Sequence, residues 1–282
     1  MSADFALPEV AEADASGDIA ALYETIRADT GSRLVNYVWR HLASIDGAAP
    51  WLWQVTRAND HRPLAALVGR TADAAAGPLA AETRPVAPVA MDAAAQDIVA
   101  VYNVNNVGNL SRVFMLLEAL RRPSGEARSR SAAPAAGRAN APADAALPPL
   151  PRFSDLSQAE LDAIAAIAEA GPAADSGIVP SLWRHLAVEP GLIERLRAPL
   201  AAALASPHFV AAFDDLRARA MTAAADIPLT LPPPARFDRA AATLGLARFS
   251  RRIAELTLAG RVLTEWTRAP ADPSSAAQES RP

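Results

Sequence analysis

The chain has 282 residues, no cysteine and a formal net charge of −4 at neutral pH. This length allows one large domain or two small ones. The lack of cysteine excludes disulfides and thiolate chemistry, and interspersed charges of both signs do not favour nucleic-acid binding. No apolar run approaches the ~20 residues that span a bilayer, and the acidic N-terminus lacks a secretory layout. We therefore expect a cytoplasmic protein with neither a membrane nor a nucleic-acid partner, as a monomer or a homodimer.

The composition and the apolar periodicity predict an all-α fold. Ala and Leu dominate, Arg and Glu are frequent, and alternating β-branched runs are almost absent. Most prolines fall between periodic segments, where they would separate helices. The pattern predicts ten helices, over residues 17–28, 33–45, 48–57, 61–76, 91–121, 157–170, 177–187, 190–205, 208–225 and 236–268.

A stretch rich in proline, alanine and small polar residues divides the chain. Residues 122–151 contain almost no large apolar side chain, so we expect a flexible linker there. The same composition over 270–282 predicts a disordered tail. The two helical regions are then 1–121 and 152–269.

Two segments on either side of this linker match each other without a gap. Residues 34–47 read LVNYVWRHLASIDG and residues 178–191 read IVPSLWRHLAVEPG, with seven of fourteen positions identical. The shared WRHLA contains tryptophan, of which the chain has only five, and this argues against coincidence. We therefore predict two tandem helical repeats that form an intramolecular pseudo-dimer.

Known catalytic and metal-binding motifs are absent from the sequence. None of the four histidines has metal-ligand spacing with another ligand, and no G-x-S-x-G, P-loop or G-x-G-x-x-G sequence occurs. We expect no metal and no cofactor. Because His41 and His185 occupy matching positions in the two segments, we interpret them as structural.

An unusual run of asparagines opens the predicted helix 91–121. At about 100° per residue, Tyr102, Asn105, Asn106 and Asn109 share one arc, which continues towards the C-terminus with apolar side chains. Buried amides are destabilising unless they are hydrogen-bonded. This arc therefore faces water, a ligand or a polar network inside a cavity; the alternative is a solvent-exposed helix start.

The two matching segments also differ in polar residues. Asn36 and Tyr37 in the first correspond to Pro180 and Ser181 in the second, while both tryptophans are either core anchors or cleft residues. We predict a single asymmetric pocket between the two halves. Its candidate ligand-binding residues are Asn36, Tyr37, Trp39, Asn103, Asn106, Asn109 and Ser181.

Several of these sequences together resemble the group I (D- and L-acting) 2-haloacid dehalogenases. They are the opening ALPEV…ASGDIAALYETIR, the repeats VNYVWRHLA and VPSLWRHLA, and the YNxxN helix start. The resemblance covers both halves but not the linker or the tail. It implies an all-helical pseudo-dimer with one site, where an aspartate activates water that displaces halide from C2 with inversion. An asparagine would help to hold that water, and aromatic side chains, a serine and backbone amides would hold the substrate.

Carried over to this chain, the resemblance assigns the asparagine to Asn106, the aromatic residue to Trp39 and the serine to Ser181. The aspartate of the family directly follows that serine, and here the position is Leu182. The nearest carboxylates in sequence are Asp175 and Glu189. Asp175, together with Asn106, is the candidate catalytic residue.

Three functions remain open from the sequence. The first is a hydrolytic 2-haloacid dehalogenase-like activity on small 2-substituted carboxylic acids. The second is a non-catalytic relative that binds a small carboxylate or acyl compound. The third is a helical scaffold protein. A carboxylate within reach of Asn106 would favour the first over the second, and a solvated asparagine face without a cavity would favour the third.

Overall fold

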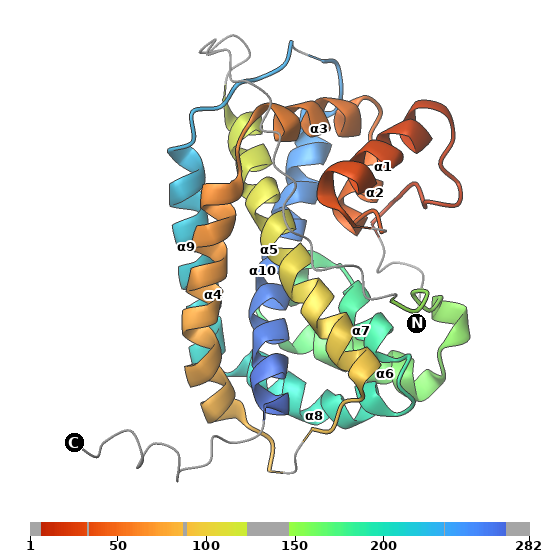
Figure 1. Ribbon diagram of the computed structural model, residues 1–282, viewed down its shortest axis with the longest axis vertical. Coiled ribbons are helices and arrows are strands. Elements are labelled where there is room, and N and C mark those ends of the chain that lie inside the picture. Colours follow the sequence, from red (N-terminus) through yellow and green to blue (C-terminus); the bar gives the residue numbers. More distant parts are fainter. Residues whose placement is uncertain (1–6, 33, 87–88, 123–146, 234, 269–282) are drawn as a thin grey trace, which may run out of the picture.

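The computed structural model describes residues 7–32, 34–86, 89–122, 147–233 and 235–268, and these ranges are helical with no strand (Figure 1). The predicted all-α fold is confirmed. The helices are α1 (Gly17–Thr30), α2 (Tyr37–Ala43), α3 (Ala48–Ala58), α4 (Arg62–Thr83), α5 (Ala93–Arg121), α6 (Gln158–Ala170), α7 (Ser181–Leu186), α8 (Leu192–Ala205), α9 (Pro207–Ala225) and α10 (Arg239–Thr267). Two short 3-10 turns, η2 (Phe153–Asp155) and η3 (Ala174–Ser176), precede α6 and α7.

The two longest helices form the centre of the molecule. Helices α5 and α10 pack along each other, and α4 and α9 cover them on one side (Figure 1). The shorter helices α1 to α3 lie at one end and α6 to α8 at the other. Helix α2 contacts α10, whereas α7 contacts α5. Each of these two short helices, which carry the shared WRHL sequence, therefore packs on the long helix of the other half of the chain.

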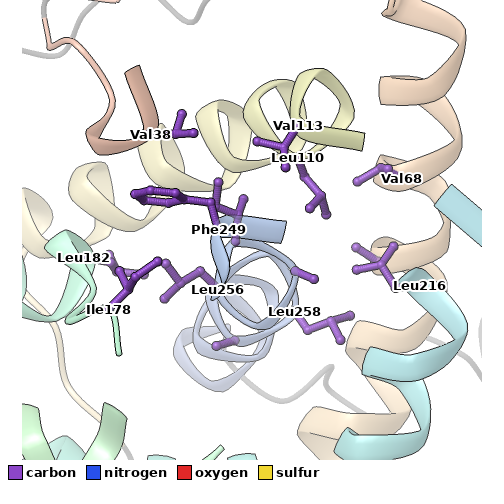
Figure 2. Packing of buried hydrophobic residues seen from close by; sticks show 14 of the residues in the cluster. Val38, Val68, Leu110, Val113, Ile178, Leu182, Leu216, Phe249, Leu256 and Leu258 are labelled. Carbon is purple, nitrogen blue, oxygen red and sulfur yellow. The ribbon is translucent and has the colours of Figure 1, made fainter. Parts of the chain in front are cut away.

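The core is continuous through this arrangement. Figure 2 shows Leu110 and Val113 of α5 beside Phe249 and Leu258 of α10, all of them buried. Trp39 and Trp183 are also buried, at 1% and 0% exposure. Burial of each large apolar side chain stabilises the fold by about 1.5–3 kcal/mol, which explains why the two tryptophans anchor their short helices.

Helices α2 and α7 both begin later than the sequence pattern predicted. The side-chain Oδ1 of Asn36 accepts a hydrogen bond from the Val38 amide at 3.1 Å and caps α2. Pro180, with an extended backbone, occupies the same place before α7. The predicted helices 33–45 and 177–187 are therefore too long, because these caps fix the first helical residue.

Helix α4 is longer than predicted, since it continues through Pro78 to Thr83. The prediction ended it at residue 76 on the assumption that proline separates helices. Pro78 lies on the exposed side of the helix, and so does Ala74, whose carbonyl loses its intrahelical donor. Water can hydrate that carbonyl, while Leu79 and Ala80 bury their side chains in the core.

Both ends of the predicted linker are described, but most of it is not. Residues 123–146 and the predicted tail from 270 onwards lie outside the described residues. At one end, Nη2 of Arg122 donates to the carbonyl of Ile227 at 2.9 Å. At the other, the carbonyl of Pro148 accepts a hydrogen bond from Nε2 of His185 at 2.7 Å.

Within the ranges given above, no single helix has the length and apolar character to cross a membrane. Helices α8 and α9 meet that test only as a pair, which is bent by 67°.

Candidate functional site

A cavity of about 490 Å³ lies where the two halves of the chain meet. Its walls come from the end of α1, from α2, from the start of α4, from α5 and α10, and from the segments that precede α6 and α7. Most of the side chains on these walls are apolar or aromatic. A volume of this size is within the range of ligand-binding pockets, which also combine an apolar lining with a few polar groups.

The asparagines of α5 supply polar groups to this cavity. Asn106 and Asn109 border it, and their exposed fractions are only 3% and 7%. The amide nitrogen Nδ2 of Asn106 is buried without a hydrogen-bond partner in the described part of the chain. An amide left in this state is destabilising by about 1–3 kcal/mol, and a ligand or a water molecule in the cavity would supply the acceptor.

Four more of the predicted residues border the same cavity, namely Asn36, Tyr37, Trp39 and Ser181. The hydroxyl of Tyr37 donates to the carbonyl of Leu7 at 2.7 Å, and its ring meets the ring of Phe249 edge-on at 5.2 Å. Trp39 packs edge-on against Trp53 at 4.8 Å. The rings of Tyr37 and Trp39 are thus held in place by neighbouring rings before any ligand arrives.

Asn103 does not border the cavity. Its Nδ2 donates to the carbonyl of Gly260 at 3.2 Å and to Oγ1 of Thr264 at 3.0 Å, both on α10. A Cβ atom at Gly260 would lie 2.1 Å from Oδ1 of Asn103. The missing side chain of Gly260 therefore allows α10 to approach α5 at this level, and Asn103 joins the two helices instead of facing a ligand.

Asp175 is also away from the cavity. It lies in η3 with a side chain that is 71% exposed, and its Oδ1 pairs with Nε of Arg251 at 3.0 Å. Leu182, at the position where the resemblance implies an aspartate, is completely buried next to Ile178 and Leu256 (Figure 2). Neither position offers a carboxylate to the cavity, and the place of Asp175 does not support the predicted catalytic role.

Glu12 is the only acidic residue among the described residues that border the cavity. Its Oε1 accepts a hydrogen bond from the amide of Val35 at 3.0 Å, and its other oxygen pairs with Arg27. These two contacts hold the segment before α2 against α1, which is a structural role for Glu12.

Arginines are more numerous on the cavity walls, and three of the four have a carboxylate partner. Nε of Arg40 lies 3.1 Å from Glu9, and Nε of Arg62 lies 2.7 Å from Asp60. Arg252 pairs with Glu255 in the interior. The remaining arginine, Arg112, forms no ion pair with a described residue.

The sequence-based prediction missed Arg112. Its exposed fraction is 9%, and its Nε is buried with no hydrogen-bond partner within the described ranges. Burial lowers its pKa to about 10, which leaves the guanidinium protonated at neutral pH. The available signal was its position three residues after Asn109, on the continuation of the asparagine arc, inside an otherwise apolar stretch.

His61, which precedes α4, stands beside this charge. Burial lowers its pKa to about 4, and the positive charge of Arg112 acts in the same direction. His61 is therefore neutral at pH 7 and adds no second cation. In the part of the chain that the structure describes, no group of His, Asp and Glu residues is arranged to hold a metal ion.

No family model matches this sequence, and no curated protein matches it at a significant level. The cavity and the side chains that face it are therefore the basis for assigning a function.

Proposed function

We propose that the cavity binds a small organic acid or acyl compound. The observation that carries this proposal is the buried Nδ2 of Asn106, which lacks a partner in the described residues and borders a cavity of about 490 Å³. Three of the four arginines on its walls pair with carboxylates, and the one glutamate, Glu12, pairs with Arg27. The charge of Arg112 stays unbalanced among the described residues, so the cavity favours an anion over a cation. A carboxylate or carbonyl oxygen would satisfy the amide.

Binding is better supported than hydrolysis because the described cavity wall offers no free carboxylate as a general base, and His61, the one histidine among the described lining residues, has a pKa of only about 4 and is a weak base. A base must lie within hydrogen-bond reach of the attacking water. Leu182 is apolar and buried, Asp175 is exposed on η3, and Glu12 is already engaged with Arg27 and the Val35 amide.

Hydrolysis of a 2-haloacid is the second candidate. Asn106, Trp39 and Ser181, which the resemblance to the group I dehalogenases assigned to the site, all border one cavity. In this case Glu12, the only carboxylate among the described lining residues, is the candidate base. Halide release from both enantiomers of a 2-halopropionate tests the activity, and loss of that release in Glu12→Gln tests the base.

We also propose that the two halves are related by an approximate two-fold axis. Helices α5 and α10 have the same length of 29 residues, and the contacts of α2 with α10 and of α3 with α5 have counterparts in those of α7 with α5 and of α8 with α10. His41 and His185 each donate to a proline carbonyl at 2.7 Å, through Nδ1 to Pro8 and through Nε2 to Pro148, so the two contacts are similar but use different ring nitrogens. Superposition of 15–121 on 157–268 in an experimental structure should bring Trp39 onto Trp183.

Isothermal titration calorimetry of the full chain with straight-chain carboxylates tests the binding function. Asn106→Leu should lower the affinity by about fivefold or more, since a lost buried hydrogen bond corresponds to about 1–3 kcal/mol. The fold should persist, because Leu110 and Val113 already bury apolar side chains on this face of α5.

Asn103→Leu is the matched control on the same helix. Its amide bonds to Gly260 and Thr264 outside the cavity, so this change should leave the affinity unaltered. Equal affinity in the wild type and in Asn106→Leu would remove Asn106 from the site. No binding of any carboxylate to the wild type would overturn the proposed function.

A further inference from the structure

Arg112 has a defined place on the wall of the cavity. It lies on α5, one turn after Gly108 and three residues after Asn109. A Cβ atom at Gly108 would lie 3.0 Å from Nη1 of Arg112. The guanidinium therefore folds back over its own helix at a point where glycine leaves room for it, on the turn that carries Asn109.

Its charge is unbalanced within the described residues. The negative charge of Asp29 raises the pKa of Arg112 slightly against the effect of burial, but Oδ2 of Asp29 already pairs with Nε of Arg57 at 3.2 Å. A buried charge without a partner is strongly destabilising. A fold that retains such a charge in a cavity wall is suited to a ligand that brings the opposite charge.

The guanidinium also has the right geometry for a carboxylate. Its parallel N–H groups match the two oxygens of a carboxylate, which gives a bidentate pair with a fixed orientation. Nε of Arg112 and Nδ2 of Asn106 are both buried without a partner among the described residues, and both side chains border the same cavity. Both belong to α5.

The rest of the cavity is apolar and larger than a short acid requires. Val107, Phe249, Ile253 and Leu256 are among its lining residues. A non-hydrogen atom with its hydrogens takes up at most the roughly 30 Å³ of a liquid water molecule. An acid of about six such atoms would therefore leave more than half of the space of about 490 Å³ empty.

We propose that Arg112 binds the carboxylate of the ligand and that the apolar wall formed with α10 receives a hydrocarbon body longer than that of a three-carbon acid. This inference rests on the proposed function, whose ligand class it narrows to a medium-chain monocarboxylic acid. Arg112 is the specificity-determining residue for the acid group.

Calorimetry on the full chain with octanoate, octanamide and propionate tests this inference at neutral pH. The wild type should bind octanoate at least tenfold more tightly than octanamide, and propionate more weakly than octanoate. Arg112→Met, which keeps an apolar stem, should lower the octanoate affinity by at least tenfold and remove the preference for the acid over the amide. Arg112→Lys should bind octanoate with an affinity between those of the wild type and Arg112→Met, because lysine retains the charge but cannot form the bidentate pair of a guanidinium.

Arg219→Met provides the control variant. Arg219 on α9 pairs with Asp215 at 2.7 Å and is not part of the cavity wall, so its loss should leave the octanoate affinity within about twofold of the wild type, as expected for a distant surface site.

The outcomes separate this inference from the proposed function. Unchanged octanoate binding in Arg112→Met would overturn the role of Arg112 and leave the acid-binding function in place. Tighter binding of propionate than of octanoate would overturn the inference that the ligand has a long hydrocarbon body. Failure of the wild type to bind any of the acids would overturn both proposals. If Arg112→Met did not fold, equal affinity of the wild type for octanoate and octanamide would still refute the inference.

Discussion

Helices α5 and α10 both bury polar side chains in their central turns, but only α10 provides all of them with partners. In α10, Arg252 and Glu255 are 2% and 0% exposed and pair with each other. Nη2 of Arg252 also donates to the carbonyl of Ala168 at 3.0 Å. In α5, the amide of Asn106 and the guanidinium of Arg112 have no such partners in the described chain. Burial alone does not mark a binding site, whereas a buried polar group that lacks a partner and also borders a cavity is a candidate for one.

The difference comes from what covers each helix. The loop before η3 closes over Glu255, since the amide of Ala173 donates to Oε2 at 2.9 Å. A Cβ atom at Gly171 would lie 2.2 Å from the same oxygen, so only glycine permits this approach. The central turns of both helices border the cavity, but on α5 no described loop supplies an acceptor to Asn106 or an anion to Arg112.

Removal of one partner from the ion pair in α10 should have the largest effect on stability. Glu255→Ala would leave Arg252 buried and unpaired, so we expect the free energy of unfolding to fall by about 3–5 kcal/mol. Urea denaturation followed by circular dichroism measures it. The double variant Arg252→Met with Glu255→Leu should recover most of the loss. A loss below about 1 kcal/mol in Glu255→Ala, which is typical of exposed pairs, would contradict the structural role.

The equivalent change in α5 should have the opposite sign. Arg112→Met removes a buried charge that has no described partner, so we expect unfolding stability equal to or greater than that of the wild type without ligand. The same denaturation experiment measures it. Destabilisation of Arg112→Met by several kcal/mol would show that α5 and α10 do not differ in this respect.

Acid should weaken the fold on the α5 side of the cavity. His61 has a pKa of about 4 in the folded protein against an ordinary value of 6.5, so the unfolded chain binds the proton more readily between these values. The stabilisation that comes from neutral His61 is therefore fully present above pH 6.5 and is lost as the pH falls towards 4. His61 should account for about 2 kcal/mol of loss between about pH 7.5 and about pH 5.

Urea denaturation at the two pH values, with His61→Gln as the comparison, measures this contribution. Burial also lowers the pKa of His41 and His185, so part of the pH dependence should remain in the variant. Arg112→Met should reduce the dependence as well, because the charge of Arg112 helps to lower the pKa of His61. An identical pH dependence in the wild type and in His61→Gln would contradict the assignment.

Asn103 and Asn106 allow the comparison to be made within α5 itself. Asn103→Leu should lower the free energy of unfolding by about 1–3 kcal/mol, because it leaves groups on α10 without their donor. Asn106→Leu should change it by much less, since no described group loses a partner. Thermal or urea denaturation distinguishes the two. Equal losses in both variants would indicate a structural role for Asn106.

These residues also show how far the sequence could define the site. An asparagine on an apolar arc predicts a buried amide, and Asn106 and Asn109 are buried beside the cavity. Whether Asn103 joins them depends on how closely α10 approaches, which Gly260 determines from far along the chain. Arg112 was missed because an isolated arginine in an apolar stretch usually extends its charge to solvent.

The fold was more accessible to prediction than the site. Helix periodicity is local, so nine of the ten predicted segments needed only changes at their ends, while α4 continued beyond Pro78 because its free carbonyl can be hydrated. The position of Asp175 on an exposed turn depends on how η3 packs against α10. Spacing within the sequence carries no information about that contact.

The smallest expected effect is at Gly108, where stability and binding should move in opposite directions. Alanine is favoured over glycine inside a helix by about 0.5–1 kcal/mol, so Gly108→Ala should raise the free energy of unfolding by a similar amount. The added Cβ would lie 3.0 Å from Nη1 of Arg112, and the guanidinium would have to move by a few tenths of an ångström. A displaced guanidinium fits a carboxylate less well, so octanoate should bind a few-fold more weakly while the affinity for octanamide is unaffected.

Gly77→Ala is the matched control, because Gly77 lies inside α4 with open space around its Cβ position. It should show the gain in stability without the loss of binding. A Gly108→Ala variant with the same octanoate affinity as Gly77→Ala would contradict the inference that the position of the Arg112 guanidinium over Gly108 is important for ligand binding.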